Sequence, residues 1–168
     1  MALIVEDGPG KVNAEAYCDA AFATAHHIAR AKGDDWDAVD DKEAALRRAT
    51  DYIEQTYRGR WSGMRWTNEQ ALDWPRVDVA WPDSPQGYRP YNVIPVELKR
   101  ACAELALRTA AGDLLADLGR ETLSEKVDVI EVTYAEGGSR QTQFAAVDRL
   151  LRSLMKGGGG FSIPMVRS

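Results

Sequence analysis

The sequence predicts a mainly α-helical fold: a small helical bundle around a long central helix, with a β-hairpin or short strands and extended terminal arms. Three patterns support this. Apolar residues recur at three- and four-residue steps behind Pro95 and again behind Asp41, as in helices that bury one face. The β-branched residues of 127–134 alternate in the manner of a strand. We expect one domain over residues 1–156, followed by a glycine joint and a docking tail over 157–168.

The central helix is predicted to begin at Pro95, because proline at the first helical position loses no hydrogen bond. Neither glycine nor proline interrupts the pattern before Gly112, so we expect the longest helix and the centre of the core here. The buried stripe would comprise Leu98, Ala101, Cys102, Leu105 and Ala106, continued by Leu114, Leu115 and Leu118.

Two helices are predicted before it. The first would begin near Asp19, bury Tyr17, Ala21, Ala25 or Phe22, and Ile28, and be closed by Gly33. The second would be capped by Asp40 or Asp41 and end by Arg58-Gly59. Its buried stripe would be Ala45, Leu46, Ala49, Tyr52, Ile53 and Tyr57. Residues 1–12 read as an extended arm or edge strand that ends in a turn.

Residues 58–93 carry no sustained period and many glycines and prolines, which predicts a long irregular loop with at most a helical turn at 68–72. Loops of this length are commonly functional. The loop holds four of the five tryptophans. We expect most of these rings to pack on the helices, and Trp81, which lies between charges and prolines, to be exposed.

After the central helix we expect a hairpin over 127–143, with a strand from Val127 to Tyr134 and a turn at 137–139. Such a hairpin needs a partner, either the N-terminal arm or a neighbouring subunit. A short helix over 144–154 would follow. The residues after Gly157–Gly160 are either a disordered terminus or, because they alternate large apolar side chains, a peptide that docks on another surface.

Composition and charge limit the classes of protein to which the chain can belong. The 168 residues are 45% hydrophobic and 28% charged, which is ordinary for a globular protein. We expect no leader peptide and no membrane span, and therefore synthesis in the cytoplasm. Cys18 and Cys102 would be buried and reduced. The net charge is −5, yet segment 34–43 is acidic and segment 149–168 is basic. These are either solvated surfaces or complementary ends for head-to-tail association.

No catalytic, cofactor or metal site is predicted, and we expect no enzyme. The sequence has no phosphate-binding glycine loop and no nucleophile motif. His26 and His27 are adjacent, so they would point to different sides of a helix, with no carboxylate or thiol at ligand spacing.

Nucleic-acid binding has one candidate segment. Arginines alternate with tryptophans there, and bases could stack on the rings while the cations meet phosphates. Arginines stacked on tryptophan within the loop would explain the same pattern without a ligand. The residues are Arg58, Arg60, Trp61, Arg65 and Trp66.

Several segments, in order over nearly the whole chain, resemble one family. They are Leu-Asp-Trp-Pro-Arg at 72–76 and Ile-Pro-x-x-Leu-Lys-Arg-Ala-Cys-Ala-Glu-Leu-Ala at 94–106, with 3–8, 42–53, and 124–127 leading to 132–134. The pattern is similar to the head–tail adaptor (connector) proteins of tailed bacteriophages, which also carry the description DnaT-like single-stranded-DNA-binding. The 77–93 loop is longer and richer in proline than that pattern.

The resemblance implies a structural virion protein, made in the host cytoplasm and placed in the phage neck. It would form a ring, commonly of twelve copies, that joins the portal protein to the tail-ward stopper or connector protein and continues the DNA channel. The alternative is a DnaT-like accessory protein that binds single-stranded nucleic acid. No cofactor and no membrane partner are implied.

The adaptor reading assigns expected roles to individual residues. Docking on the portal or on an adjacent copy would use Phe161, Ile163, Met165 and Arg167. Contacts between subunits or with the next ring would use Asp34, Asp35, Asp37, Val127, Val129, Val132, Tyr134 and Trp81. The residues that match the family pattern and would fix the loop against the central helix are Trp74, Pro75, Arg76, Ile94 and Pro95.

Overall fold

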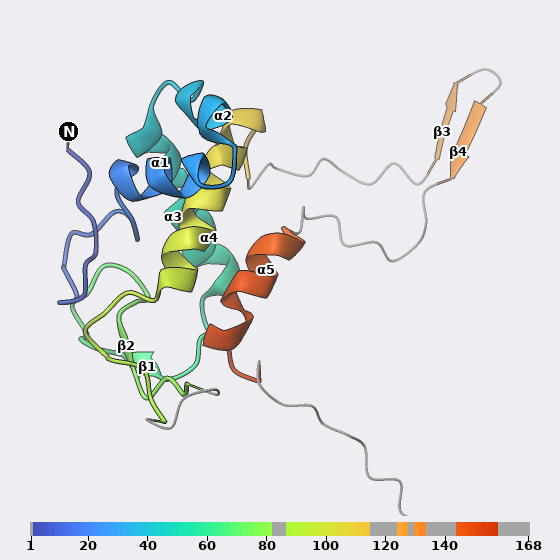
Figure 1. Cartoon of the computed structure of the whole chain (residues 1–168). Coiled ribbons are helices and arrows are strands. Elements are labelled where there is room, and N and C mark those ends of the chain that lie inside the picture. Colours follow the sequence, from blue (N-terminus) through green and yellow to red (C-terminus); the bar gives the residue numbers. More distant parts are fainter. Residues whose placement is uncertain (1, 82–86, 115–123, 128–129, 134–143, 158–168) are drawn as a thin grey trace, which may run out of the picture.

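The computed structural model describes residues 2–81, 87–114, 124–127, 130–133 and 144–157. It is mainly α-helical with short antiparallel strands, as predicted (Figure 1). The helices are α1 Ala20–Ile28, α2 Gly33–Asp37, α3 Lys42–Tyr57, α4 Val96–Arg108 and α5 Ala145–Leu151, with the 3₁₀ turns η1 Thr109–Ala111 and η2 Arg152–Leu154. The strands are β1 Met64–Arg65, β2 Arg76–Val77, β3 Ser124–Val127 and β4 Ile130–Thr133.

Helix α4 lies at the centre of the bundle and packs against α1, α3 and α5 (Figure 1). Its predicted buried stripe from Leu98 to Ala106 is confirmed. Two details of the prediction are wrong. The helix begins at Val96, with Pro95 as its N-cap, and it ends at Arg108 in η1, so the 16-residue α3 is longer. Gly112, at φ 150°, ends this segment, and Leu115 and Leu118 lie outside the described residues.

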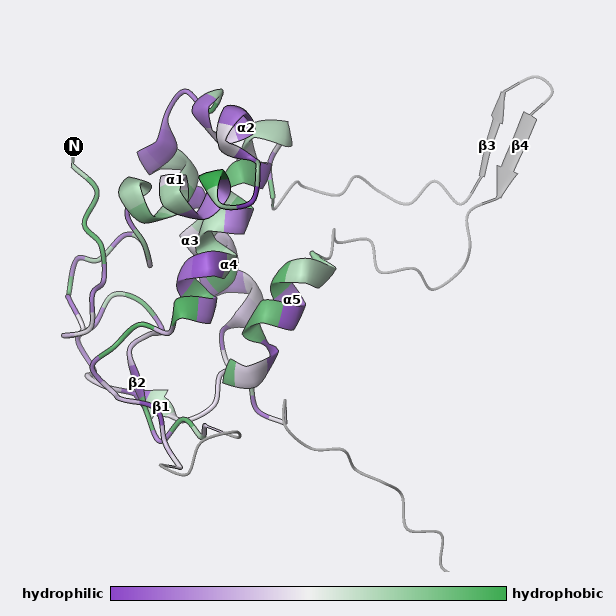
Figure 2. Ribbon diagram, viewed as in Figure 1, coloured by the Kyte–Doolittle hydropathy of each residue, from purple (hydrophilic) through white to green (hydrophobic). Residues whose placement is uncertain are grey.

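Helix α3 follows the prediction closely. The Asp41 side chain accepts a hydrogen bond from the Ala44 N–H at 2.9 Å, which caps the first turn. The helix ends before Arg58, and its predicted apolar stripe is buried. Figure 2 shows α4 and α5 each carrying apolar and polar residues, as expected for helices that bury one side.

Helix α1 begins where expected, with Asp19 accepting from the Phe22 N–H at 2.7 Å. Tyr17 is buried and Phe22 half-buried, as predicted, but the rest of the predicted buried face is wrong. His26 and His27 are buried, whereas Ile28 is 62% exposed. The reason is tertiary. Gly33 starts α2 instead of closing α1, and α2 folds back so that the buried Trp36 ring lies 5.0 Å from the His27 ring.

The N-terminal arm, predicted as an extended segment that ends in a turn, packs on its own chain. Val5 forms a parallel bridge with Ala16, and the Glu6 N–H donates to Ala16 O at 2.9 Å. The buried Glu6 carboxylate accepts from the backbone N–H groups of Gly8, Gly10 and Lys11. A single carboxylate thus closes the turn at 7–10.

The hairpin is formed by β3 and β4, with Val127 opposite Ile130. The strand predicted to run unbroken from Val127 to Tyr134 is therefore divided between two paired strands, and the predicted turn at 137–139 lies outside the described residues. Alternation of β-branched residues did not reveal this division, because the sequence has no glycine between Val127 and Ile130. Val127 and Val132 lie in the strands, while Val129 and Tyr134 lie outside the described residues.

The remaining elements agree with the sequence. Helix α5 and η2 bury Val147, Leu151 and Leu154. Cys18 and Cys102 are buried free thiols. Within the described residues, every helix is too short or too polar to span a lipid bilayer.

The central position of α4 is tested by Leu98→Ala. Because Leu98 is fully buried, we expect a cavity and a loss of about 2–5 kcal/mol in the free energy of unfolding, measured by urea denaturation. The matched control is Val96→Ala in the same helix, an exposed position where about 0.5 kcal/mol or less is expected. Equal losses at the two positions would contradict this packing.

Candidate functional site

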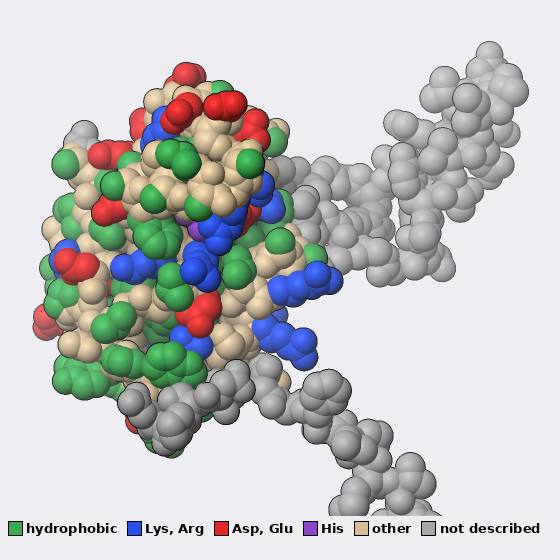
Figure 3. Space-filling model, viewed as in Figure 1, with side chains coloured by type: hydrophobic (Ala, Val, Ile, Leu, Met, Phe, Trp, Pro, Cys, Tyr) green, Lys and Arg blue, Asp and Glu red, His purple; other side chains and the backbone are tan. Residues whose placement is uncertain are grey.

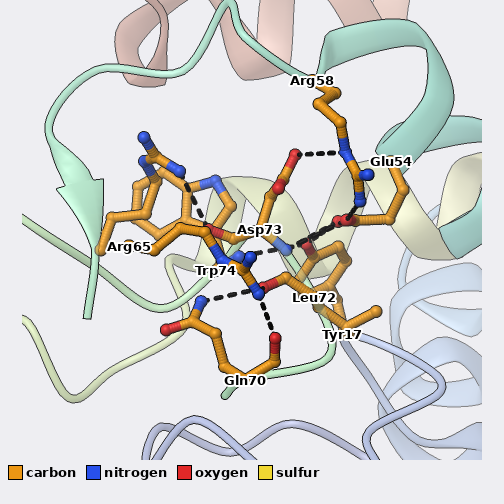
Figure 4. A network of polar contacts seen from close by, with 9 residues as sticks. Tyr17, Glu54, Arg58, Arg65, Gln70, Leu72, Asp73 and Trp74 are labelled. Atoms are coloured by element: carbon orange, nitrogen blue, oxygen red, sulfur yellow. Dashed lines mark hydrogen bonds and ion pairs between the residues drawn. The ribbon is translucent and has the colours of Figure 1, made fainter. Parts of the chain in front are cut away.

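The irregular loop predicted over 58–93 is confirmed in its described residues, 58–81 and 87–93, apart from the two-residue strands β1 and β2, and residues 68–72 form no helical turn. A buried polar network attaches the loop to the bundle (Figure 4). The Tyr17 hydroxyl donates to Glu54 on α3, and Glu54 accepts the backbone N–H of Asp73 at 3.0 Å. The Trp74 N–H in turn donates to the Tyr17 oxygen at 3.3 Å. One helix side chain therefore fixes the middle of the loop.

Opposing effects act on the Glu54 carboxyl. Burial raises its pKa, while the Tyr17 hydroxyl, the Asp73 N–H and Arg58 stabilise the charged form and offset part of this. Arg58 lies 3.3 Å from Glu54 and 3.7 Å from Asp73, so it bridges helix and loop at the surface. Burial and the adjacent Glu54 raise the pKa of Tyr17 well above its ordinary value. Tyr17 therefore stays protonated and remains a donor.

The loop is also cross-linked internally. Arg76 donates to the carbonyl oxygens of Ser62 at 2.8 Å, Gly63 at 2.8 Å and Asp73 at 3.1 Å. The Gln70 amide donates to Leu72 O at 2.8 Å and to Pro75 O at 3.0 Å. These bonds join β1, β2 and the turn between them into one unit.

The five residues that match the family pattern have clear positions. Trp74, Pro75, Ile94 and Pro95 are buried, and the Trp74–Pro75 peptide bond is cis. The Trp74 ring meets Trp61 edge-on, with centroids 5.9 Å apart. The backbone N–H groups of Asp73 and Trp74 donate to Glu54 on α3 and to Tyr17. We had expected the central helix, α4, to hold this segment.

The anchored loop presents apolar side chains to solvent. The ring of Trp66, 42% exposed, lies against Tyr91, 47% exposed, with centroids 4.3 Å apart. Figure 3 shows hydrophobic side chains gathered at the end of the molecule where β1 and β2 lie in Figure 1. We use the name loop face for the large exposed apolar residues of this loop other than Trp81, namely Met64, Trp66, Tyr88, Tyr91 and Val93, of which Trp66 and Tyr91 contact one another.

Trp81 is exposed, as predicted, at 38%. The Arg89 guanidinium lies 5.1 Å from its ring centre, and Arg89 also pairs with Glu97 on α4 at 3.0 Å. Trp66, which the sequence named as a candidate for base stacking and not as the exposed ring of the loop, is slightly more exposed than Trp81.

The predicted row of arginines and tryptophans does not form one surface. Trp61 is buried, Arg58 pairs with two carboxylates, and the Arg60 guanidinium lies 5.2 Å from the Tyr57 ring centre. Arg65 and Trp66 are exposed. Of the two tryptophans named for base stacking, Trp61 is therefore inaccessible and only Trp66 could stack on a base.

The two charged segments lie on different elements. Asp34, Asp35 and Asp37 are exposed on α2. The exposed cations of the basic segment lie on α5, on η2 and just after η2. Figure 3 shows acidic groups over α2 and Lys or Arg over α5. Within 144–157 the cations are Arg149, Arg152 and Lys156, and Asp148, the one acid, accepts from the Tyr57 hydroxyl at 2.6 Å.

The structure places Glu104 of α4 beside the histidine pair, which corrects the expectation that no carboxylate lies near it. Ligand atoms of His26, His27 and Glu104 lie within 4.8 Å of one another. However, Glu104 already binds His26 at 3.1 Å, Lys32 at 3.2 Å and Arg108 at 3.0 Å. Although burial opposes ionisation, these partners hold the Glu104 pKa at about 2. Two cations on the carboxylate disfavour a further metal ion, and an internal ion-pair cluster explains the group.

Other expected site residues lie outside the described residues: Phe161, Ile163, Met165 and Arg167 of the tail. A depression of about 280 Å³ between α3 and the η1 segment is lined by Arg48, Asp51, Gln55, Thr109 and 112–114. Among these residues we find no nucleophile beside a general base.

A family model described as "Putative DnaT-like ssDNA binding protein" matches residues 1–168. The chain belongs to this family. The match covers the loop, the loop face and the α5 cations alike. Its description names single-stranded DNA and does not mention a virion. No curated protein and no solved structure matches the chain.

The role of the buried carboxyl is tested by Glu54→Gln, which keeps the shape and removes the charge. Because the folded pKa is raised above the ordinary 4.5, the folded chain holds this proton more tightly than the unfolded chain does between the two values. We therefore expect the free energy of unfolding of wild type, relative to Glu54→Gln, to fall as pH rises from 4.5. Urea titrations over this range measure it.

The control for that series is Glu69→Gln, at an exposed position of the same loop. There the substitution should change the free energy of unfolding by about 0.5 kcal/mol or less. If instead the free energy of unfolding of wild type, relative to Glu54→Gln, rose with pH, the folded state would favour the charged carboxylate. Arg58 and the N–H donors would then outweigh burial.

Proposed function

We propose that the protein is a structural adaptor of a tailed-phage neck, which acts by binding and not by turnover. Copies would form a ring, commonly of twelve, between the portal protein and the tail-ward connector, around the channel that DNA traverses. The observation that carries the proposal is the loop face, a set of exposed Trp, Tyr, Met and Val side chains held on an anchored loop. Clustered exposed apolar side chains of this kind mark protein interfaces.

The charge distribution supports the same function. The acidic α2 surface and the basic α5 surface differ, so a contact that joins them is head-to-tail, and head-to-tail contacts close into rings when the rotation allows. A net charge of −5 also suits a DNA conduit, because a strongly basic wall would retain phosphates.

The proposal assigns roles to the segments beyond the bundle. The tail residues Phe161, Ile163, Met165 and Arg167 would dock on the portal or an adjacent copy. The β3–β4 hairpin, whose two strands pair with one another, would contact neighbouring subunits or face the channel. Asp34, Asp35 and Asp37 would meet basic groups of the next copy or ring.

Removal of residues 157–168 tests the adaptor function. We expect the truncated chain to keep its helical circular-dichroism spectrum but to lose the joining of tails to portal-bearing heads, measured by sedimentation and negative-stain microscopy. The control replaces 157–160 by Ser residues, which keeps a flexible joint and should preserve joining. Joining at the wild-type level without the tail would remove the docking role.

Single-stranded DNA binding is the second candidate, and the family description favours it. Two structural features would serve it. The exposed Trp66 and Tyr91 rings offer a surface for base stacking, and Arg149, Arg152 and Lys156 offer contacts to phosphates. The acidic total charge and the burial of Trp61 weigh against a long binding track.

Arg152→Ala tests this candidate. If α5 contacts phosphates, oligothymidylate affinity should fall and the slope of log affinity against log salt should decrease by about one unit, measured by fluorescence anisotropy. Arg30→Ala, an exposed arginine on the turn after α1, is the control and should leave both quantities unchanged. Identical affinities for wild type and Arg152→Ala would exclude α5 as the contact.

A further inference from the structure

The described chain leaves the bundle at the margin of the loop face. Residues 154–156 pair with residues 60–62: the Ser62 N–H donates to Leu154 O at 2.9 Å, and the Lys156 N–H donates to Arg60 O at 2.8 Å. Met64, the first residue of the loop face, follows Ser62 by two positions. The segment that begins at residue 158 therefore starts close to an exposed apolar surface.

The direction of the chain at this point matters. Trp61 and Met155 form an antiparallel bridge, so from 154 to 156 the chain runs from Ser62 toward Arg60 and Gly59. It leaves heading away from β1 and from Met64 of its own copy. To reach Met64 it would have to reverse after residue 156. The loop face of a second copy can lie in the direction in which the chain leaves, so the chain can reach it without reversing.

The sequence after the glycines is chemically suited to the loop face. In an extended chain, residues two apart share a side, so Phe161, Ile163 and Met165 would present one apolar row. Pro164 disfavours a helix there. A methionine thioether and a phenyl ring both make favourable contacts with Trp and Tyr rings.

We propose that residues 161–166 of one copy bind the loop face of a second copy, against Trp66 and Tyr91. The eleven residues 158–168 span up to about 36 Å when extended, enough to cross to a neighbour. This inference rests on the proposed ring and deepens it. The donor segment and the acceptor face are different surfaces, so each copy gives one contact and receives one, which builds a ring or an open chain.

A peptide titration tests the contact directly. The probe is a synthetic peptide of residues 157–168, added to the full-length chain carrying Phe161→Ser and Ile163→Ser, whose own segment cannot compete. We expect saturable binding by calorimetry, weakened about tenfold or more by Trp66→Ser. Ile28→Ser, an exposed aliphatic position on α1, is the control and should bind as well as its parent.

A mixing experiment tests the two-surface arrangement. The donor-deficient chain (Phe161→Ser, Ile163→Ser) is mixed with an acceptor-deficient chain (Trp66→Ser, Tyr91→Ser), both checked for helical content. A mixed pair retains one intact donor and one intact acceptor, so sedimentation velocity should show heterodimers and nothing larger. No heterodimer, or no peptide binding, overturns the inference.

The outcomes separate this inference from the proposed function. If wild type joins portal-bearing heads and the Trp66→Ser, Tyr91→Ser chain joins equally well, the adaptor function stands and the loop-face contact is overturned. If the peptide binds the face but wild type joins no heads, the contact stands and the adaptor function fails. If oligothymidylate binds through Trp66 and Tyr91 while the peptide does not, the face is a nucleic-acid surface and the inference is overturned.

Discussion

The structure depends on one buried carboxylate. Glu54 takes hydrogen bonds from the Tyr17 hydroxyl, from the backbone of Asp73 and from Arg58, and so joins the segment before α1, the helix α3 and the loop. Strands of two residues are too short to hold such a loop by themselves. Burial opposes the charge on Glu54, so the group is stabilising only while each donor stays in place. The loop is consequently fixed at its middle, and its exposed rings sit on a rigid support.

The anchored loop and helix α5 present two surfaces of different chemistry. The loop face is apolar and aromatic, and its Trp66–Tyr91 pair loses little conformational entropy on binding because both rings already touch. The α5 surface carries Arg149, Arg152 and Lys156, whose charges are partly screened in physiological salt. The two meet where 154–156 pair with 60–62, so a ligand on one lies close to a ligand on the other. The α2 acids belong to a different element of the bundle.

The sequence predicted what local signals control. Asp19 and Asp41 marked helix starts because capping depends on the next three residues, and the α3 and α4 stripes follow from helical period alone. Long-range packing decided the rest. His26 and His27 are buried only because α2 folds back and α4 supplies Glu104 and the Ala103 carbonyl. Glu54 was not singled out by the sequence. Its one signal was position: Thr50, Glu54 and Tyr57 share a face at steps of four and three, adjoining the apolar stripe.

The adaptor and the single-stranded-DNA proposals differ in the force each one uses. The three exposed cations of α5 and the residues after it, Arg149, Arg152 and Lys156, can release few counterions, so DNA binding there would be weak and would weaken further with salt. The net negative charge of the chain would also repel phosphates. Burial of apolar rings responds little to salt, and salts such as sulfate strengthen it. A contact centred on Trp66 and Tyr91 should therefore persist at ionic strengths that release DNA from α5. Under the adaptor proposal the exposed apolar side chains, more than the cations, would form the contact, whereas under the single-stranded-DNA proposal the same rings would stack on bases and the cations would add the salt-dependent part.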